Sequence, residues 1–387
     1  MHAIAATLVL CFCLLHPTTS SVQPPSNISS CLLYNGVRNF SLPLSPSYAT
    51  LLDSSIQNLR FALPDVSKPA ALIIPTSKLD LQRAILCARN SSLAIRVRSG
   101  GHSYEGLSYT VENHVPFVVI DLMNLNRVHV DSVSGTAWVE SGATLGELYY
   151  AIGQSNRSLA FSAGSCSTVG MGGFVSGGGF GLISRKFALA ADNVLDAIFM
   201  DPNGNALNRG SMGDDVFWAI RGGELGIVES DLSEMSWIES TTKFARLNST
   251  ADLTDRKLGV KHYSKSKSDY VHSPISMQDT IKIIEYLSNG PQGFIQLNPY
   301  GGAMARIGSS KLPFPYRAGY LYSIEYSVSW KASDNDGADE YIRWLRSFYA
   351  YMAPHVSKNP WAAYVNYLDL DLGTNNWRNA IDGTSNN

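Results

Sequence analysis

The sequence is poor in charge and has almost no charge imbalance. Of 387 residues, 30 are Lys or Arg and 32 are Asp or Glu, so charged residues make up 16% of the chain and the formal net charge is −2. A chain so evenly balanced has no global field to attract a polyanion, and nucleic acid is not an expected partner. Because 45% of the residues are apolar, the chain has enough material for a buried core, which excludes intrinsic disorder.

Long hydrophobic runs are also absent. No stretch after residue 15 reaches about 18 uninterrupted apolar residues, so no transmembrane helix is expected. The apolar run 3–15 is too short to span a bilayer, and small residues follow it. This pattern predicts a secretory signal peptide that ends near Ser20 or Ser21, with a buried N-terminal helix as the alternative.

Five N-glycosylation sequons agree with export. They begin at Asn27, Asn39, Asn90, Asn156 and Asn248. We therefore expect a secreted glycoprotein, located in the extracellular space, the cell wall or the vacuole.

Cysteine is scarce, and its number is informative. Of the five cysteines, Cys11 and Cys13 lie in the predicted signal peptide, which leaves Cys31, Cys87 and Cys166. In an oxidising compartment two of these three can pair, and the third needs its own explanation, of which a buried unpaired thiol is the simplest. No further soft ligands lie at zinc-binding spacing, and no local pattern of a cysteine protease is present.

Short strands and helices alternate along the chain without the regularity of a βαβ repeat, which predicts an α+β fold. Helices are predicted at 79–89, 143–154 and 338–356. Strands are predicted within 92–104 and at 116–122, 127–131, 136–142, 194–201, 293–302 and 321–330. The Ser, Lys and Asp-rich stretch 248–274 is expected to be a loop.

Glycine is concentrated in two segments. Seven of the twelve residues from Gly170 to Gly181 are glycine, and apolar residues that favour burial stand between them, unlike in a flexible linker. We interpret this segment as backbone held against a large ligand. The second segment, RVRSGGHSYEG at 96–106, can point backbone N–H groups at phosphate oxygens. It does not have the Rossmann pattern, and a purely structural role for His102 is the alternative.

These segments, together with DVFWAIRGG, PFPYRAG, NPW and YVNYLDLDLG, resemble the plant berberine bridge enzyme-like family from about Cys31 to the end of the sequence. The resemblance implies a two-subdomain FAD-binding fold of the vanillyl-alcohol-oxidase (PCMH) type with an incomplete α+β substrate domain. It divides the chain into a signal peptide (1–21), an N-terminal segment (22–64), an FAD-binding domain (65–240) and a partial substrate domain with the start of the family's C-terminal region (241–387).

The same resemblance assigns the site. It implies FAD joined covalently to His102 and Cys166, and a disulfide between Cys31 and Cys87. It implies Glu325 as the catalytic base, with Tyr104 and Tyr367 orienting a small-molecule substrate. Val169 matches the position that gates oxygen, so O2 is the expected electron acceptor. Further contacts to FAD are expected from Arg98, Ser99, Gly100, Gly101, Ser103, Gly164, Gly170, Gly172, Gly173, Gly177, Gly178 and Gly179.

The sequence also departs from the family pattern. The motif GELGIVESDLSEMSWIES follows DVFWAIRGG directly, so we expect a long internal block to be missing at Gly223–Glu224, and the family's terminal flavin-domain segment to be missing as well. Phe174 and Phe180 stand where a flavin-contacting His and a Tyr are usual. Ser323, Arg306 and Leu368 replace residues that are usually Lys, Glu and Arg.

Three hypotheses follow. The first is a monomeric, secreted, FAD-dependent oxidase, without a metal, that removes hydride from a small alcohol, sugar or phenolic. The second is a catalytically impaired or inactive glycoprotein of the same ancestry. The third is a carbohydrate-binding wall protein without flavin.

Overall fold

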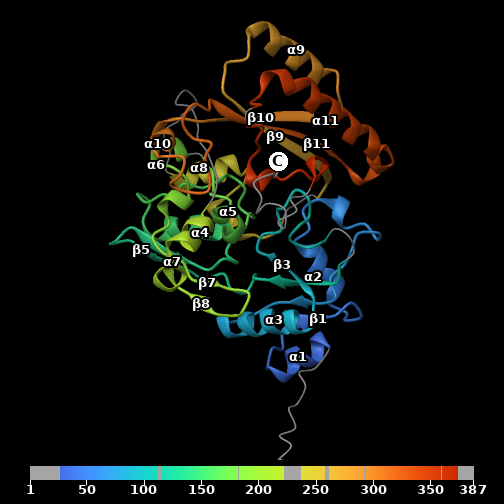
Figure 1. Cartoon of the computed structure of the whole chain (residues 1–387), viewed down its shortest axis with the longest axis vertical. Coiled ribbons are helices and arrows are strands. Elements are labelled where there is room, and N and C mark those ends of the chain that lie inside the picture. The colour runs from blue at the N-terminus through green and yellow to red at the C-terminus, as the bar shows by residue number, and fades with distance from the viewer. Residues whose placement is uncertain are drawn as a thin grey trace, which may run out of the picture.

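The computed structural model describes residues 27–111, 115–181, 183–221, 237–257, 261–291, 293–358 and 360–373. The predicted signal peptide and the Gly223–Glu224 junction lie outside the described residues. Figure 1 shows the chain in two parts, with the N-terminal half below and the C-terminal strands and helices above.

A four-stranded sheet with strand order β1-β2-β4-β3 organises the lower part. The strands are β1 (Phe40–Ser41), β2 (Leu72–Ile73), β3 (Ala94–Arg98) and β4 (Phe117–Asp121). Strand β4 runs parallel to β2 and β3 and is buried on both faces, as its uninterrupted apolar sequence FVVI favours. The helices of this part are α1 (Ile28–Tyr34), α2 (Tyr48–Ser54) and α3 (Lys78–Asn90).

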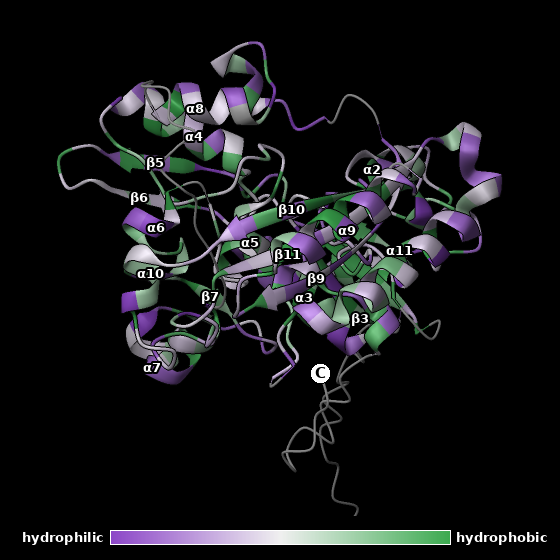
Figure 2. Ribbon diagram, turned by 90° about the horizontal axis from the view of Figure 1, so that it is seen from above, coloured by the Kyte–Doolittle hydropathy of each residue, from purple (hydrophilic) through white to green (hydrophobic). Residues whose placement is uncertain are grey.

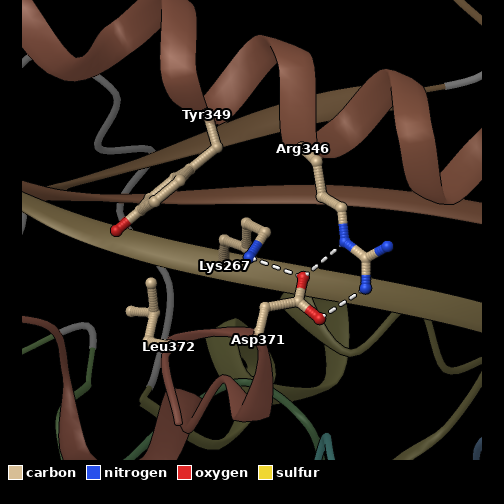
Figure 3. A pocket seen from close by; sticks show the side chains of 5 residues that line it. All are labelled: Lys267, Arg346, Tyr349, Asp371 and Leu372. Carbon is tan, nitrogen blue, oxygen red and sulfur yellow. Dashed lines mark hydrogen bonds and ion pairs between the residues drawn. The ribbon is translucent and has the colours of Figure 1, made fainter.

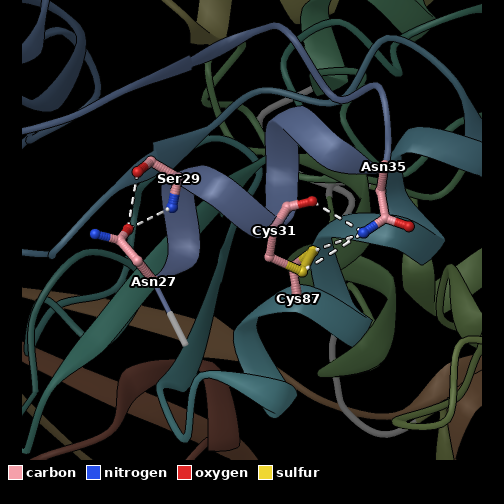
Figure 4. The surroundings of a disulfide bond; sticks show 5 residues. All are labelled: Asn27, Ser29, Cys31, Asn35 and Cys87. Atoms are coloured by element: carbon pink, nitrogen blue, oxygen red, sulfur yellow. Dashed lines mark hydrogen bonds between the residues drawn. A yellow bond between two sulfur atoms is a disulfide. The ribbon is translucent and has the colours of Figure 1, made fainter. Parts of the chain in front are cut away.

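The Cys31–Cys87 disulfide joins α1 to α3, so the pairing implied by the family resemblance is confirmed (Figure 4). Both cysteines are buried in the core between these helices and the sheet. The Asn35 side chain donates a hydrogen bond from Nδ2 to the Cys31 carbonyl oxygen (2.9 Å), which satisfies the C-terminal end of α1.

The segment 122–262 contains two hairpins and several helices. Its hairpins are β5 (Val128–Asp131) with β6 (Thr136–Val139), and β7 (Phe199–Met200) with β8 (Ala206–Leu207). Its helices are α4 (Leu145–Ser155), α5 (Met171–Ser176), α6 (Ser184–Phe187), α7 (Arg209–Ala219) and α8 (Trp237–Phe244). The Thr144 and Glu147 side chains form a capping box, which explains why α4 begins at Leu145.

The upper part is an antiparallel sheet with strand order β10-β11-β9, covered by helices (Figure 1). Its strands are β9 (Tyr263–Val271), β10 (Gly293–Pro299) and β11 (Tyr322–Trp330), and its helices are α9 (Met277–Ser288), α10 (Gly302–Arg306) and α11 (Ala338–Met352). Helix α11 packs Leu345 and Phe348 against Tyr326 and Val328 of β11. After it, 3-10 turns form at Ala353–His355, Val365–Tyr367 and Leu370–Leu372.

The expectation of a loop at 248–274 is wrong. Residues Thr250–Thr254 form a 3-10 turn, and β9 is a nine-residue strand paired with all of β11. Lys265, Lys267 and Asp269 of β9 are buried, and its ribbon carries hydrophilic colours although the strand lies among other elements (Figure 2). Alternating charged and Ser residues are typical of an exposed loop. Here the charges are neutralised by groups from distant parts of the chain, which the local sequence does not indicate.

Candidate active site

Three side chains from distant parts of the chain meet at the upper sheet. The Tyr104 hydroxyl donates a hydrogen bond to Oε1 of Glu325 on β11 (2.9 Å). The rings of Tyr104 and Tyr367 are stacked, with centroids 5.1 Å apart and planes inclined by 11°. The structure therefore brings together the expected base and both expected tyrosines.

Burial controls the ionisation of this group. Glu325 is 5% exposed, and burial raises the pKa of its carboxyl, although hydrogen bonds from Tyr104, Ser266 and Tyr367 act in the opposite direction. The pKa of Tyr104 is also raised, first by burial and then by the negative charge of Glu325. A raised pKa makes this carboxylate a stronger base than an exposed one, which suits it to accept a proton from a substrate.

The second group joins the two expected attachment residues. Nε2 of His102 lies 2.8 Å from Oγ1 of Thr168, and the same hydroxyl lies 3.6 Å from Sγ of Cys166. Burial lowers the pKa of His102 to about 4, so the imidazole is neutral at physiological pH and keeps a nitrogen lone pair. Cys166 is a free, exposed thiol.

Close backbone contact explains part of the glycine pattern. A Cβ at Gly100 would lie 2.4 Å from the Gly170 nitrogen and from the Thr168 oxygen, and a Cβ at Gly170 would collide with Ser99. Any side chain at either position would push the two glycine segments apart. Gly101 has φ of +71° and faces the Ser55 carbonyl, so it needs glycine for both reasons.

Most of the other expected FAD-contacting glycines are required by contacts within the protein or by a positive φ, and one faces open space. Gly172 and Gly177 face Ser141 and Asn366, while Gly178 and Gly179 have φ of +98° and +74°. At Gly173, by contrast, a Cβ would meet nothing within 4 Å. Much of the glycine content therefore serves packing within the protein, and Gly173 leaves open space of the kind that we interpreted as ligand contact.

Arg98 has a different role from the one expected of its side chain. The guanidinium is 0% exposed and is bonded to Asp121 (Nε to Oδ2, 2.6 Å) and to the carbonyls of Leu51 and Leu52. It ties β3 to β4 and α2, so any contact that Arg98 makes with a cofactor is left to its main chain. The Ser99 hydroxyl likewise donates to the Ser141 carbonyl (2.6 Å), and the Ser103 hydroxyl accepts from the Leu107 amide (3.1 Å).

Two of the substituted positions, Phe174 and Phe180, pack in hydrophobic clusters, whereas Leu368 and Arg306 are exposed. Phe174 packs in the core around α4 and α5, beside Val169, and its ring contacts Gly179. Phe180 packs with Tyr367 and other aromatic residues of a second cluster. Tyr149 donates a hydrogen bond to the carbonyl of Gly164, which fixes the backbone two residues before Cys166.

All five sequon asparagines are exposed: Asn27, Asn39, Asn90, Asn156 and Asn248. Asn27 also caps α1, because its Oδ1 accepts a hydrogen bond from the Ser29 amide (2.9 Å). Within the described ranges no helix is long and apolar enough to cross a membrane. The same residues include no cluster of three or more His, Cys, Asp or Glu that could hold a metal ion.

Several residues of the site carry no obvious signal in the sequence. Thr168 links the attachment residues, Asn366 contacts both Gly177 and the Tyr364 hydroxyl (3.0 Å), and Glu105 follows Tyr104 into the interior. The alternating acids of YLDLDLG and the alternating lysines of YSKSKSD could have indicated a shared buried network. Nothing in either segment alone indicates the partner.

Comparison with known proteins shows extensive similarity in sequence and structure. A family model described as FAD binding domain matches residues 69–210. Berberine bridge enzyme-like D-2 of Nicotiana tabacum is 41% identical over 470 residues, covering 93% of this chain and 83% of the relative. Reticuline oxidase of Eschscholzia californica is also 41% identical, over 92% of this chain and 83% of the relative. A solved structure of a berberine bridge enzyme variant in complex with (S)-reticuline superimposes with a TM-score of 0.86 at 40% identity, covering 93% of this chain and 90% of that chain.

The fold and site together define an FAD-linked oxidoreductase of the vanillyl-alcohol-oxidase type. More specifically, the chain belongs to the berberine bridge enzyme-like family.

The alignment is longer than this chain. Because 93% of 387 residues is about 360, about 110 of the 470 aligned positions have no residue in this chain. That number is large enough for the internal block that the sequence motifs indicate to be missing.

Proposed function

We propose that this chain is a secreted oxidase that holds FAD covalently through His102 and Cys166 and removes hydride from a small alcohol, sugar or phenolic, with O2 as the electron acceptor. The observation that carries the proposal is the Thr168 hydroxyl, which lies within hydrogen-bond distance of His102 and in contact with Cys166. The side chains of two glycine segments, 64 residues apart, thus meet at one point.

The residues present suit FAD. His102 is neutral, Cys166 is exposed, and Gly173 leaves room where a side chain would stand. When bound there, FAD would supply the hydride acceptor and the redox chemistry. Among the described residues, Cys31 and Cys87 form a disulfide, and Cys166 is the one cysteine outside it. In the oxidising environment that the sequons and the disulfide indicate, its thiol is therefore available for a bond to FAD.

The chain's own residues would handle the substrate and its proton. Glu325 would accept the proton of a substrate hydroxyl or phenol at a carboxylate oxygen, since its pKa is raised by burial. Tyr104, bonded to Glu325, and Tyr367, stacked on Tyr104, would orient the substrate. Val169 stands where a small residue would let oxygen approach. The chain would act as a monomer.

Covalent attachment is tested by acid precipitation of the purified protein. We expect the precipitate of the parent chain to stay yellow. His102→Ala and Cys166→Ala should each stay yellow through the remaining bond, whereas the double variant should release its flavin. A colourless parent precipitate, or a yellow precipitate of the double variant, would refute the attachment.

The gap of about 110 aligned positions favours a second candidate, a member of the family with impaired turnover. Removed strands would weaken the wall of the substrate site, and a misplacement of about 1 Å can cost around a hundredfold in rate. Peroxide release from a panel of alcohols, sugars and phenols distinguishes the two. If the second candidate is right, the 387-residue chain should release little peroxide, and release should become measurable once the corresponding block of a relative is inserted. Rapid release without the insertion would exclude impairment.

A further inference from the structure

The three side chains of the candidate site need something to hold them in place, because they come from a loop after β3, from β11 and from a 3-10 turn near residue 366. Glu325 is fixed by its strand, since β11 pairs with β9 along its whole length and Glu325 lies opposite Ser268. Tyr104 and Tyr367 belong to no sheet. Their stacked arrangement rests on the hydrogen bonds of both hydroxyls with Glu325, on the contact of Tyr367 with the Tyr364 ring (centroids 4.8 Å apart), and on contacts made by the residues beside them.

Lys265 of β9 contacts a residue beside each of the two tyrosines. Its ammonium group forms an ion pair with Glu105, the residue after Tyr104. It also lies 2.7 Å from Oδ1 of Asp369, two residues after Tyr367. Lys265 is 2% exposed and both carboxylates are buried with it, so water does not screen these contacts.

A second layer of charge surrounds this contact but reaches only one of the two segments. Lys267 pairs with Asp369 and, at 2.8 Å, with Asp371, which Arg346 of α11 also holds (2.6 Å) (Figure 3). Lys267, Asp371 and Arg346 line a surface pocket of about 480 Å³. No contact joins Lys267 to Glu105 or to Tyr104 among the ion pairs of the described residues.

We propose that Lys265 is a positioning residue: by holding Glu105 and Asp369 on one ammonium group, it sets the stacking of Tyr104 on Tyr367 and the placement of both against Glu325. A single buried cation shared by the two loops gives them one common reference on β9, the strand that also positions Glu325. Lys265 acts on catalysis only if the function proposed above holds, whereas the position of the two rings can be measured without it.

The test is the contact between the two rings in solution. The full-length protein is deuterated except for its tyrosine rings, which carry 1H. Its NMR spectrum should then show a nuclear Overhauser cross-peak between the ring protons of Tyr104 and Tyr367. Tyr104→Phe and Tyr367→Phe identify it, because each removes one labelled ring. We expect Lys265→Met to abolish the cross-peak. Its absence from the parent protein, or its persistence in Lys265→Met, would overturn the proposal.

Lys267→Met is the matched control, because it removes the same charge from the same buried strand but contacts only the Tyr367 side. It should keep the cross-peak. Equal loss in this variant would assign the effect to the charge network as a whole and overturn the role of Lys265. If Lys265→Met does not fold, Lys265→Met/Glu105→Gln avoids an unpaired buried carboxylate at Glu105 while the tie stays broken. Loss of the cross-peak there supports the proposal, and its retention overturns it.

Discussion

Asp269 gives a quantitative prediction for the buried charges of β9. The side chain is 1% exposed, and its Oδ1 accepts hydrogen bonds from Trp361 (3.0 Å) and from the Tyr349 hydroxyl (3.3 Å). Burial raises the pKa of Asp269 from 3.8 to about 7, although hydrogen bonds from Trp361, Tyr326 and Tyr349 and the charge of Lys267 act in the opposite direction.

The sign of the pH dependence follows from this shift. Between about pH 4 and pH 7 the folded protein holds a proton on Asp269 that the unfolded chain has lost, so the free energy of unfolding falls as the pH rises. The slope is about 1.4 kcal/mol per pH unit well below pH 7 and flattens near it, which amounts to about 2 kcal/mol between pH 5 and pH 7, about 3 kcal/mol by pH 8, and little change above pH 8. Asp269→Asn keeps an acceptor for Trp361 and cannot ionise, so it should lose none of this stability.

The assay is urea denaturation, followed by tryptophan fluorescence, of the parent and of Asp269→Asn at pH 5, 6, 7 and 8. We expect the variant to gain about 3 kcal/mol relative to the parent across this range. Asp279→Asn on α9 is the control, because hydrogen bonds from Ser276 and Lys282 lower the pKa of Asp279, and its titration lies below pH 5. A difference between Asp269→Asn and the parent that is the same at pH 5 and pH 8 would refute the reasoning.

Three further predictions concern stability and activity. Replacing Cys31 and Cys87 with Ser should lower the free energy of unfolding by about 4 kcal/mol, since the disulfide closes a loop with a sequence separation of 56; urea denaturation without reductant that leaves the midpoint unchanged would contradict this. Thr144→Ala should cost about 1 kcal/mol by removing the cap of α4, and Thr144→Ser should restore it in the same assay. With the missing block restored, Glu325→Gln should slow flavin reduction in stopped-flow absorbance by about a hundredfold or more, and an unchanged rate would exclude Glu325 as the base.

The sequence was sufficient where local pattern decides structure. The apolar spacing of 79–89 predicted α3, and the segments 116–122 and 321–330 predicted β4 and β11. It was insufficient at β9, because the burial of Lys265 and Lys267 depends on Glu105 and Asp369, which lie more than a hundred residues away. A strand whose charges are neutralised by distant groups has the same local pattern as an exposed loop.

The candidate site was predictable only in part and mainly through family resemblance. Nothing local to Tyr104 or Glu325 predicts their hydrogen bond across 221 positions of sequence. The excess of glycine was interpreted as backbone held against a large ligand, but at Gly100 and Gly170 the approaching group is the protein's own backbone. Arg98 was also expected to contact FAD, but its guanidinium bonds to Asp121 and to the carbonyls of Leu51 and Leu52 in the protein interior.

Peptide mass spectrometry of the purified, acid-precipitated protein tests the central claim most directly. If His102 and Cys166 hold FAD together, digestion should give flavin mass on the peptide of each residue, and the parent should yield neither peptide in unmodified form. Unmodified His102 and Cys166 peptides from folded protein would contradict the account.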